Sequence, residues 1–486
     1  MPAFSLEPEQ TAWCAELRTL AEERLRPLAE KGEPGRVNRP LLAELGRLGL
    51  LSRLFTSGAL DLCLMRESLA RACTEAETAL ALQGLGAHPV HAHGTPAQRE
   101  RWLPRVSDGT AVAAFALSEP GAGSDAAALA LRAEPTGAEG EAAASGTGPR
   151  YGPAGTSRGQ VPTGPDGPSG GEAPPTGPGD TLAPGPAAGG VESAGRGAAP
   201  PTGRAAGAGT AAVTSPGTAS GAWPGTASGA WPGTTPDTGP TLDATPDGPR
   251  RWRLSGRKCW ISNAPEADFY TVFARTTPGA GARGVTAFLV PADRPGLTGA
   301  ALEMLSPHPI GSLDFDAVPV GEDDVLGEVD RGFRVAMGTL NLFRPSVGAF
   351  AVGMAQAALD ATLAHTARRD AFGGKLMDLQ AIAHTVAEMA LRTEAARLMV
   401  YAAATAYDEG APDVPKRAAM AKLLATETAQ YVVDAAVQLH GARALQRGHP
   451  LEHLYREVRA PRIYEGASEV QRGIIAKELY ANLEAR

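Results

Sequence analysis

Residues 135–248 contain too few large apolar side chains to build a hydrophobic core. Gly, Ala, Pro, Thr and Ser dominate this stretch, and the segment Thr218–Thr226 is repeated at once as Thr226–Thr234. Burial of such a composition cannot offset the chain entropy lost on folding, so we expect a disordered insert. The fold must therefore be built from the residues on either side. The large apolar side chains of the stretch are Tyr151, Val161, Leu182, Val191, Val213, Trp223, Trp231 and Leu242.

The residues that flank the insert change their apolar spacing twice along the chain. Residues 1–109 show helical spacing, for example over Leu41–Leu51 and Leu62–Leu82, and Thr95 is placed to begin a further capped helix. Residues 110–330 are typical of strands on both sides of the insert, which indicates one β domain interrupted at a hairpin turn. Residues 331–486 are helical again. The expected strands are Ala111–Leu117, Leu129–Glu134, Trp252–Leu254, Cys259–Ser262, Phe269–Ala274, Val285–Val290 and Leu313–Val318, and the expected C-terminal helices are Phe333–Arg368, Leu376–Asp408, Val414–His440 and Ser468–Leu483.

The charge and the termini of the chain exclude several functional classes. A formal charge of −8 gives no basic footprint for nucleic acid or an anionic membrane. The N-terminal residues match neither a signal peptide nor a transit peptide, and no continuous apolar run is long enough to span a bilayer. The scattered cysteines lack the close pairing of a metal site and favour reduced thiols. We therefore expect a cytoplasmic protein with no metal site.

Two motifs are better explained by local structure than by chemistry. Gly279–Gly284 fits G-x-G-x-x-G, but a dinucleotide site needs a helix after the motif, and here a strand follows. His449–His453 fits H-x-x-E-H, but Pro450 would lie inside the ligand helix and a third ligand is missing. We expect a hairpin loop at the first and surface residues leading into a helix at the second.

Glu465 is the best candidate for a chemical group. It lies between Tyr464 and Gly466, just before the last expected helix, which Ser468 could cap. A carboxylate on such a turn can act as a base, and a glycine lets a ligand approach the backbone. The local sequence alone favours a solvated glutamate before a capped helix, so the assignment depends on other parts of the chain.

Four motifs together resemble the acyl-CoA dehydrogenases. They are Leu117–Asp125 (Leu-Ser-Glu-Pro-Gly-Ala-Gly-Ser-Asp), Gly256–Asn263 (Gly-Arg-Lys-Cys-Trp-Ile-Ser-Asn), Arg369–Gln380, and Tyr464-Glu465-Gly466. The resemblance covers nearly the whole chain except the insert. It implies an α+β multidomain fold with an N-terminal all-α domain, a central antiparallel β-barrel-like domain and a C-terminal four-helix bundle.

The resemblance also implies a reaction in fatty acid metabolism. An acyl-CoA thioester would be converted to the 2-enoyl-CoA, with Glu465 taking the α proton and the N5 atom of FAD taking the β hydride. The backbone N–H of Glu465 and a ribityl hydroxyl would donate to the thioester oxygen. An electron-transferring flavoprotein would accept the electrons, and the protein would be a homodimer or homotetramer.

Most of the implied site residues would contact FAD, and Arg369 would reach the pyrophosphate bound by a neighbouring subunit. The implied cofactor-binding residues are Phe115, Leu117, Ser118, Ser124, Trp260, Ile261, Ser262, Arg369, Phe372, Gln380, Gln438, Gly441, Ala442, Ala467 and Glu469. The implied substrate-binding residues are Ser124, Arg344, Tyr464 and Gly466.

The sequence departs from the family pattern at three places. Ala442 stands where a further glycine is common, and Ala467 replaces a common threonine near the flavin. Some family branches carry the base at the position of Phe343, which cannot accept a proton, so Glu465 is the remaining candidate. The open alternatives are an acyl-CoA oxidase, a monooxygenase-like flavoenzyme, or a non-catalytic assembly subunit on the same scaffold. The first two would use oxygen, and monooxygenase-like branches generally lack the carboxylate of Glu465.

Overall fold

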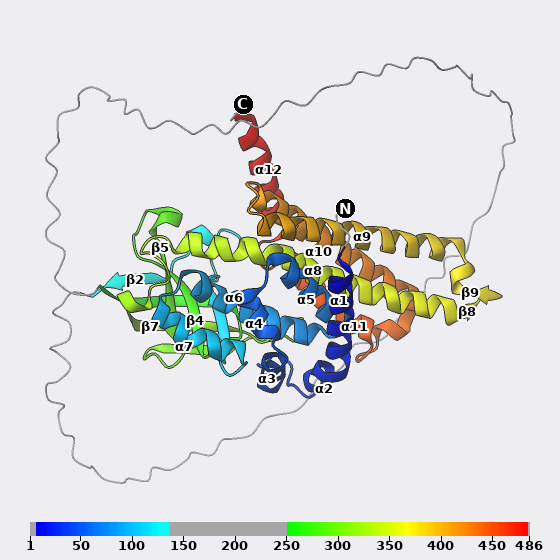
Figure 1. The fold of residues 1–486 in the computed structure, drawn as a ribbon, viewed down its shortest axis with the longest axis horizontal. Helices are drawn as coiled ribbons and strands as arrows, with labels where there is room; N and C mark the ends of the chain where they lie inside the picture. The colour runs from blue at the N-terminus through cyan, green and yellow to red at the C-terminus, as the bar shows by residue number, and fades with distance from the viewer. Residues whose placement is uncertain (1–5, 137–249, 485–486) are drawn as a thin grey trace, which may run out of the picture. The chain divides into compact units, whose positions relative to one another are not determined.

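The computed structural model describes residues 6–136 and 250–484 (Figure 1). The expected disordered insert therefore lies almost wholly outside the described residues. The described part begins with helices, continues with a curled sheet and ends with long helices, as the change of apolar spacing predicts.

The N-terminal helices follow the predicted pattern but are shorter than the apolar spacing suggests. The expected helix over Leu41–Leu51 is broken at Gly49, whose φ of 71° is left-handed, and the one over Leu62–Leu82 is broken at Cys73. Thr95 caps its helix as expected, because its hydroxyl accepts a hydrogen bond from the Gln98 amide. The helices are α1 (Pro8–Leu20), α2 (Arg26–Ala29), α3 (Arg39–Arg47), α4 (Leu50–Thr56), α5 (Ala59–Ala72), α6 (Thr74–His93) and α7 (Pro96–Ser107), with a π-helical turn at Ala21–Leu25.

The central sheet is mostly antiparallel, but β4 pairs in parallel with both β1 and β2, which departs from the expected pattern. Its order is β1-β4-β2-β3-β7-β6, with β5 paired to β4, and β1 runs parallel to β4. The expected strands Trp252–Leu254 and Cys259–Ser262 form one strand. An extra strand, β6, is poor in apolar residues and largely exposed, so its sequence gave no strand signal. The strands are β1 (Ala113–Ala116), β2 (Arg132–Pro135), β3 (Arg251–Ser262), β4 (Phe269–Arg275), β5 (Val285–Pro291), β6 (Leu297–Ala301) and β7 (Ile310–Gly321).

The two strands on either side of the insert are direct neighbours. Strand β2 pairs antiparallel with β3, with Pro135 opposite Trp252, and the Thr136 amide donates to the Arg251 carbonyl at 2.9 Å. The expected hairpin relationship between these strands is present. The Gly279–Gly284 motif lies in the turn between the antiparallel strands β4 and β5, which confirms the hairpin loop.

The C-terminal helices pack around α8 and α10. Helix α8 has the length and hydropathy of a membrane-spanning helix, but 67% of its most apolar window is buried against the rest of the protein. The expected helix Leu376–Asp408 begins later, at Gln380, because a small hairpin and a 3-10 turn at Leu376–Asp378 precede it. The elements are α8 (Gly332–Arg368), β8 (Asp370–Ala371), β9 (Gly374–Lys375), α9 (Gln380–Asp408), α10 (Val414–His440), α11 (Pro450–Glu457) and α12 (Ser468–Glu484).

Candidate functional site

Glu465 lies in the irregular turn between the 3-10 turn Ala460–Arg462 and α12, as expected. Its φ is 52° and that of Gly466 is 95°, both in the left-handed region. A Cβ at Gly466 would lie 2.5 Å from Nε2 of Gln471, which donates to the carbonyls of both turn residues. The turn therefore needs glycine at this position. The strained backbone at Glu465 is typical of a functional site.

The predicted cap of α12 is wrong. Ser468 is the first residue of the helix, and its hydroxyl donates to Oε1 of Glu427 at 2.6 Å. Glu427 also pairs with Arg462 at 2.8 Å. The Ser468 hydroxyl therefore links the first turn of α12 to α10. This contact restrains the position of the Glu465 turn, which directly precedes α12.

Glu465 is half-buried, and its carboxyl atom Oε2 lies in the buried part. Its Oε2 has no hydrogen-bond partner among the described residues. Burial raises the pKa of this carboxyl above its ordinary value, and the charges of Arg66, Lys422 and Arg344 limit the rise. A carboxylate with a raised pKa and a free acceptor atom is suited to accept a proton.

Cations hold the backbone of this turn. The Lys422 ammonium donates to the Gly466 carbonyl at 2.7 Å, and Nε of Arg344 lies 3.4 Å from the Glu465 carbonyl. Both side chains are almost completely buried. Burial lowers the pKa of Lys422 to about 8, and the charge of Glu465 opposes that shift. The peptide N–H of Glu465, in contrast to the two carbonyls, has no acceptor in the described part of the chain.

A third buried cation, Arg66, approaches the same region from α5. Its Nε forms an ion pair with Glu77 on α6, and its Nη1 donates to the Ser346 hydroxyl on α8 at 2.7 Å. The Arg66 and Glu77 side chains are 4% and 1% exposed. Among the charged groups that limit the raised pKa of Glu465, Arg66 acts most strongly. No local motif marks this ion pair, because it joins separate helices.

The Leu117–Asp125 and Gly256–Asn263 motifs are joined by a buried ion pair. The Lys258 ammonium donates to the Leu117 carbonyl at 2.9 Å and to Oε1 of Glu119 at 2.8 Å. Glu119 also accepts the amides of Ala130 and Leu131. Burial lowers the pKa of Lys258 to about 8, and the Glu119 carboxylate opposes the shift. The pair fixes the end of β1 against β3.

Trp260 offers an aromatic surface at this junction. Strand β3 bulges between Lys258 and Ile261, and Trp260 adopts a φ of 57° at the bulge. Its side chain is 48% exposed, which is unusual for an indole next to a sheet core. The Cys259 amide, beside it, donates to the Ser118 carbonyl at 3.0 Å. The bulge thus turns a large apolar side chain outward beside the Leu117–Asp125 segment, where a planar ligand could stack.

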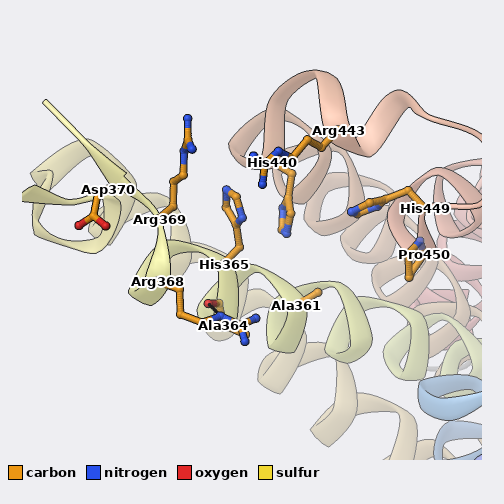
Figure 2. Close-up of a pocket in the computed structure, with 10 residues that line it drawn as sticks. All are labelled: Ala361, Ala364, His365, Arg368, Arg369, Asp370, His440, Arg443, His449 and Pro450. Atoms are coloured by element: carbon orange, nitrogen blue, oxygen red, sulfur yellow. Dashed lines mark hydrogen bonds between the residues drawn. The ribbon is translucent and has the colours of Figure 1, made fainter.

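A cationic cavity of about 580 Å³ lies at the ends of α8 and α10 (Figure 2). The rings of His365 and His440 stack with centroids 4.2 Å apart, and His449 meets His440 at 5.7 Å. Arg369 projects beside the His365 ring, whereas Asp370 points away and pairs with Lys375. The cavity is lined by Ala361, Ala364, His365, Arg368, Arg369, Asp370, His440, Arg443, His449 and Pro450.

This cavity can bind an anion such as a phosphate group. Arginine forks and imidazolium groups donate to phosphate oxygens. Burial and the charges of His440 and Arg443 lower the pKa of His365. Burial is also the main cause that lowers the pKa of His440. Both imidazoles are therefore poised to gain a proton when an anion binds beside them. In the part of the chain that the structure describes, no cluster of metal-ligating side chains is present.

The structure brings the sequence-predicted residues together in two groups. The first surrounds Glu465, with Tyr464, Gly466 and Arg344 in contact with its turn or next to it. The second is the cationic cavity, where the end of α8 that carries Arg369 meets the α10 end that carries Gln438, Gly441 and Ala442. Their roles remain predictions.

The remaining predicted residues differ in exposure. Leu117 and Ile261 are buried in the core, so only their backbone could meet a ligand. Phe372, on the β8–β9 hairpin, is 90% exposed. The half-buried residues are Phe115, Ser118, Ser262 and Ala467, and the exposed ones are Ser124, Gln380 and Glu469.

The sequence analysis missed Arg66 and Glu77 near Glu465 and His365 in the cationic cavity, and it set His449 aside as a surface residue. The histidines lie at unrelated positions in the chain, and only the packing of α8 against α10 brings them together. An arginine among the apolar residues of α5 was the one sequence signal for Arg66.

Comparison with known proteins gives one consistent result for all three parts of the chain. Residues 7–110 match the family model for the acyl-CoA dehydrogenase N-terminal domain. Residues 233–318 match the middle domain and residues 330–480 the C-terminal domain.

Individual relatives point the same way. A probable acyl-CoA dehydrogenase, FadE25, of Mycobacterium tuberculosis is 39% identical over 231 residues, which are 47% of this chain and 59% of that protein. The match thus spans somewhat over half the length of that relative. Cyclohexane-1-carbonyl-CoA dehydrogenase of Geobacter metallireducens is 27% identical over 95% of both chains. The solved butyryl-CoA dehydrogenase of Megasphaera elsdenii superimposes with a TM-score of 0.71 at 25% identity, covering 98% of this chain and 99% of that one.

Proposed function

The chain belongs to the acyl-CoA dehydrogenase family, and from this premise we propose that it oxidises an acyl-CoA thioester to the 2-enoyl-CoA with Glu465 as the base. The observation that carries the proposal is the buried carboxyl of Glu465, with a raised pKa and an unpartnered Oε2, at the family's Tyr-Glu-Gly motif. Both properties suit a group that must gain a proton during each turnover.

The family's cofactor is FAD, and the residues present fit it at two places. The half-exposed indole of Trp260 offers a surface for the flavin ring. The cationic cavity offers arginine and histidine donors for a diphosphate. When bound, FAD would supply the hydride acceptor for the β hydrogen.

The proton step can be assigned to this chain's own residues. The Glu465 carboxylate takes the α proton, and the free N–H of the same residue is available to donate to the thioester oxygen. That hydrogen bond stabilises the negative charge that the oxygen gains as the proton leaves. Lys422 and Arg344 donate hydrogen bonds to the carbonyls of the turn. These bonds fix the position of the Glu465 carboxyl relative to the peptide N–H of the same residue.

The cationic cavity supports a homo-oligomer in which Arg369 of one subunit contacts the FAD pyrophosphate bound mainly by another. The cavity lies at the end of α8, and Arg368, Arg369 and Arg443 that line it form no ion pair with the residues that the structure describes. The proposed electron acceptor is an electron-transferring flavoprotein. An oxidase, which would pass electrons to oxygen, is the second candidate because Glu465 serves both reactions.

The test uses the purified full chain. It should be yellow, and anaerobic addition of acyl-CoA should bleach the flavin absorbance. Rapid re-oxidation by air would favour the oxidase, and slow re-oxidation with rapid transfer to an electron-transferring flavoprotein would favour the dehydrogenase. A protein that carries no flavin after reconstitution with FAD would overturn the proposal and leave the non-catalytic subunit as the better reading.

A further inference from the structure

Lys422 on α10 is a buried ammonium group that forms no ion pair in the described part of the chain. Its side chain is completely buried, and its Nζ donates to a backbone carbonyl rather than to a carboxylate. Lys258 is equally buried, but its ammonium pairs with Glu119 at 2.8 Å. A buried charge without a close partner is unfavourable, so we expect Lys422 to have a role that requires its charge.

The acidic groups around Lys422 leave one counter-charge for it. The charged groups that act on its ammonium are Glu465 on the turn, Arg344 on α8, Glu427 on α10 and Glu469 on α12. Glu427 is already paired with Arg462 at 2.8 Å, and the Glu469 side chain is 81% exposed, so that water screens its charge. Among these groups Glu465 attracts the ammonium most strongly. The carboxylate of the base is therefore the counter-charge of Lys422.

A short hydrogen bond holds the ammonium beside the turn that carries the base. Nζ of Lys422 donates to the Gly466 carbonyl at 2.7 Å, whereas Nε of Arg344 lies 3.4 Å from the Glu465 carbonyl. Helix α10 packs against α12, which directly follows the turn (Figure 1). The positive charge of Lys422 is thus fixed in position relative to Glu465.

We propose that Lys422 is a positioning residue that keeps Glu465 in its carboxylate form and so sets the lower pH limit of the reaction. The inference rests on the proposed function. A nearby positive charge favours the carboxylate over the neutral acid, and only the carboxylate can accept the α proton. Arg66 acts in the same direction, but it is paired with Glu77. A substitution of Lys422 removes a charge without breaking an ion pair, which makes this residue the clearer one to test.

The charge of Lys422 shifts the pH dependence in a definite direction. Burial raises the pKa of Glu465, and the charges of Arg66, Lys422 and Arg344 lower it. Without the lysine charge this pKa rises further, so a higher pH is needed to ionise the base. Burial lowers the pKa of Lys422 itself to about 8. Above that pH the wild type loses the same charge, so its advantage over a neutral variant should diminish.

The experiment measures anaerobic flavin reduction from pH 5.5 to 9.5 in flavin-loaded wild type, K422M and K422R. The substrate is butyryl-CoA or octanoyl-CoA, whichever reduces the wild type faster. In K422M the midpoint of the rise should move up by about one pH unit, which lowers the rate at pH 6 about tenfold. The difference should narrow above pH 8. K422R keeps a positive charge and should retain the wild-type midpoint.

K416M is the matched control on the same helix. Lys416 pairs with Asp413 at 3.1 Å near the surface of α10, away from the turn. The substitution is chemically the same, but it removes a charge that does not act on Glu465. K416M should therefore give the pH profile of the wild type.

Urea unfolding gives a second measurement that does not depend on activity. If the charges of Lys422 and Glu465 compensate each other, removing either one leaves the other uncompensated, and removing both restores part of the loss. With FAD in excess in every sample, the loss of stability in K422M/E465Q should be smaller than the sum of the losses in K422M and E465Q. A lysine with a purely structural role would give additive losses.

The outcomes separate this inference from the proposed function. A K422M profile with the wild-type midpoint, a K422R profile shifted as far as that of K422M, or additive losses in urea would overturn the role of Lys422 and leave the dehydrogenation intact. If K422M holds too little flavin for kinetics, the urea comparison decides. A flavin-loaded wild type that neither thioester reduces would overturn the proposed function itself, and this inference with it.

Discussion

The Lys258–Glu119 pair offers a sharp test of how the two motifs near Trp260 are held. We consider Lys258→Met, which keeps the length of the side chain and removes its charge. The lysine is fully buried and gives up two hydrogen bonds, one to the Leu117 carbonyl and one to the Glu119 carboxylate. Both acceptors stay buried in the variant.

The magnitude follows from what remains. Removing one partner of a buried ion pair destabilises a protein by about 3–5 kcal/mol, because an uncompensated charge is left behind. Glu119 keeps the amides of Ala130 and Leu131, at 2.6 and 2.9 Å, so we expect the lower part of that range, about 3 kcal/mol. The double variant K258M/E119Q leaves no charge and should recover about half of the loss.

The assay is urea unfolding followed by circular dichroism at a fixed protein concentration, with FAD content measured alongside. K258M should unfold at a clearly lower urea midpoint and retain less FAD, since the Leu117–Asp125 segment is released from β3. An R257M variant, which removes a half-exposed surface pair with Asp314, is the control and should be nearly neutral. A free energy of unfolding for K258M within about 1 kcal/mol of wild type would refute the reasoning.

Three further predictions concern other parts of the chain. Arg369→Ala should weaken FAD retention and the oligomer together, and a monomeric variant that stays saturated with flavin by size exclusion would contradict the shared site. The pKa values of His365 and His440 are lowered in the free protein and should rise when a diphosphate binds, so the bound state holds more protons. The affinity of the apoprotein for pyrophosphate, measured by calorimetry, should therefore increase as the pH falls from 8 to 6. An affinity that does not depend on pH would argue against a role of the two histidines in binding. Replacing residues 137–249 by a two-residue turn should leave folding and FAD content intact because β2 and β3 pair directly, and an insoluble or flavin-free product would show that the segment is needed.

Much of the fold could be predicted because its signals are local. Helical spacing and caps such as Thr95 act within a few residues, and the antiparallel pairing of β2 with β3 follows from strand patterns on both sides of the insert. Errors arose where a break depends on backbone conformation, as at Gly49, or where a strand such as β6 is held by its neighbour rather than by apolar side chains.

The candidate site was predictable only in part. Glu465 could be found because a carboxylate beside glycine before a helix is a local pattern, strengthened by the family motifs. The Arg66–Glu77 pair and the stacked His365 and His440 rings could not, because each joins helices that are distant in sequence. The wrong expectation for Ser468 has the same cause: its hydroxyl finds Glu427 on α10, and that tertiary partner replaces the local cap.

The proton-accepting role of Glu465 is the central claim, and Glu465→Gln tests it most directly. The amide keeps the shape of the side chain but cannot take a proton, and Phe343 offers no substitute at the alternative position. The variant should bind FAD and acyl-CoA like wild type, while anaerobic flavin reduction in a stopped-flow mixer slows by about 10²–10⁴-fold. In wild type the same rate should rise with pH through the elevated pKa of Glu465, because the base must be deprotonated. Reduction of the flavin in Glu465→Gln within a few-fold of the wild-type rate would contradict the account.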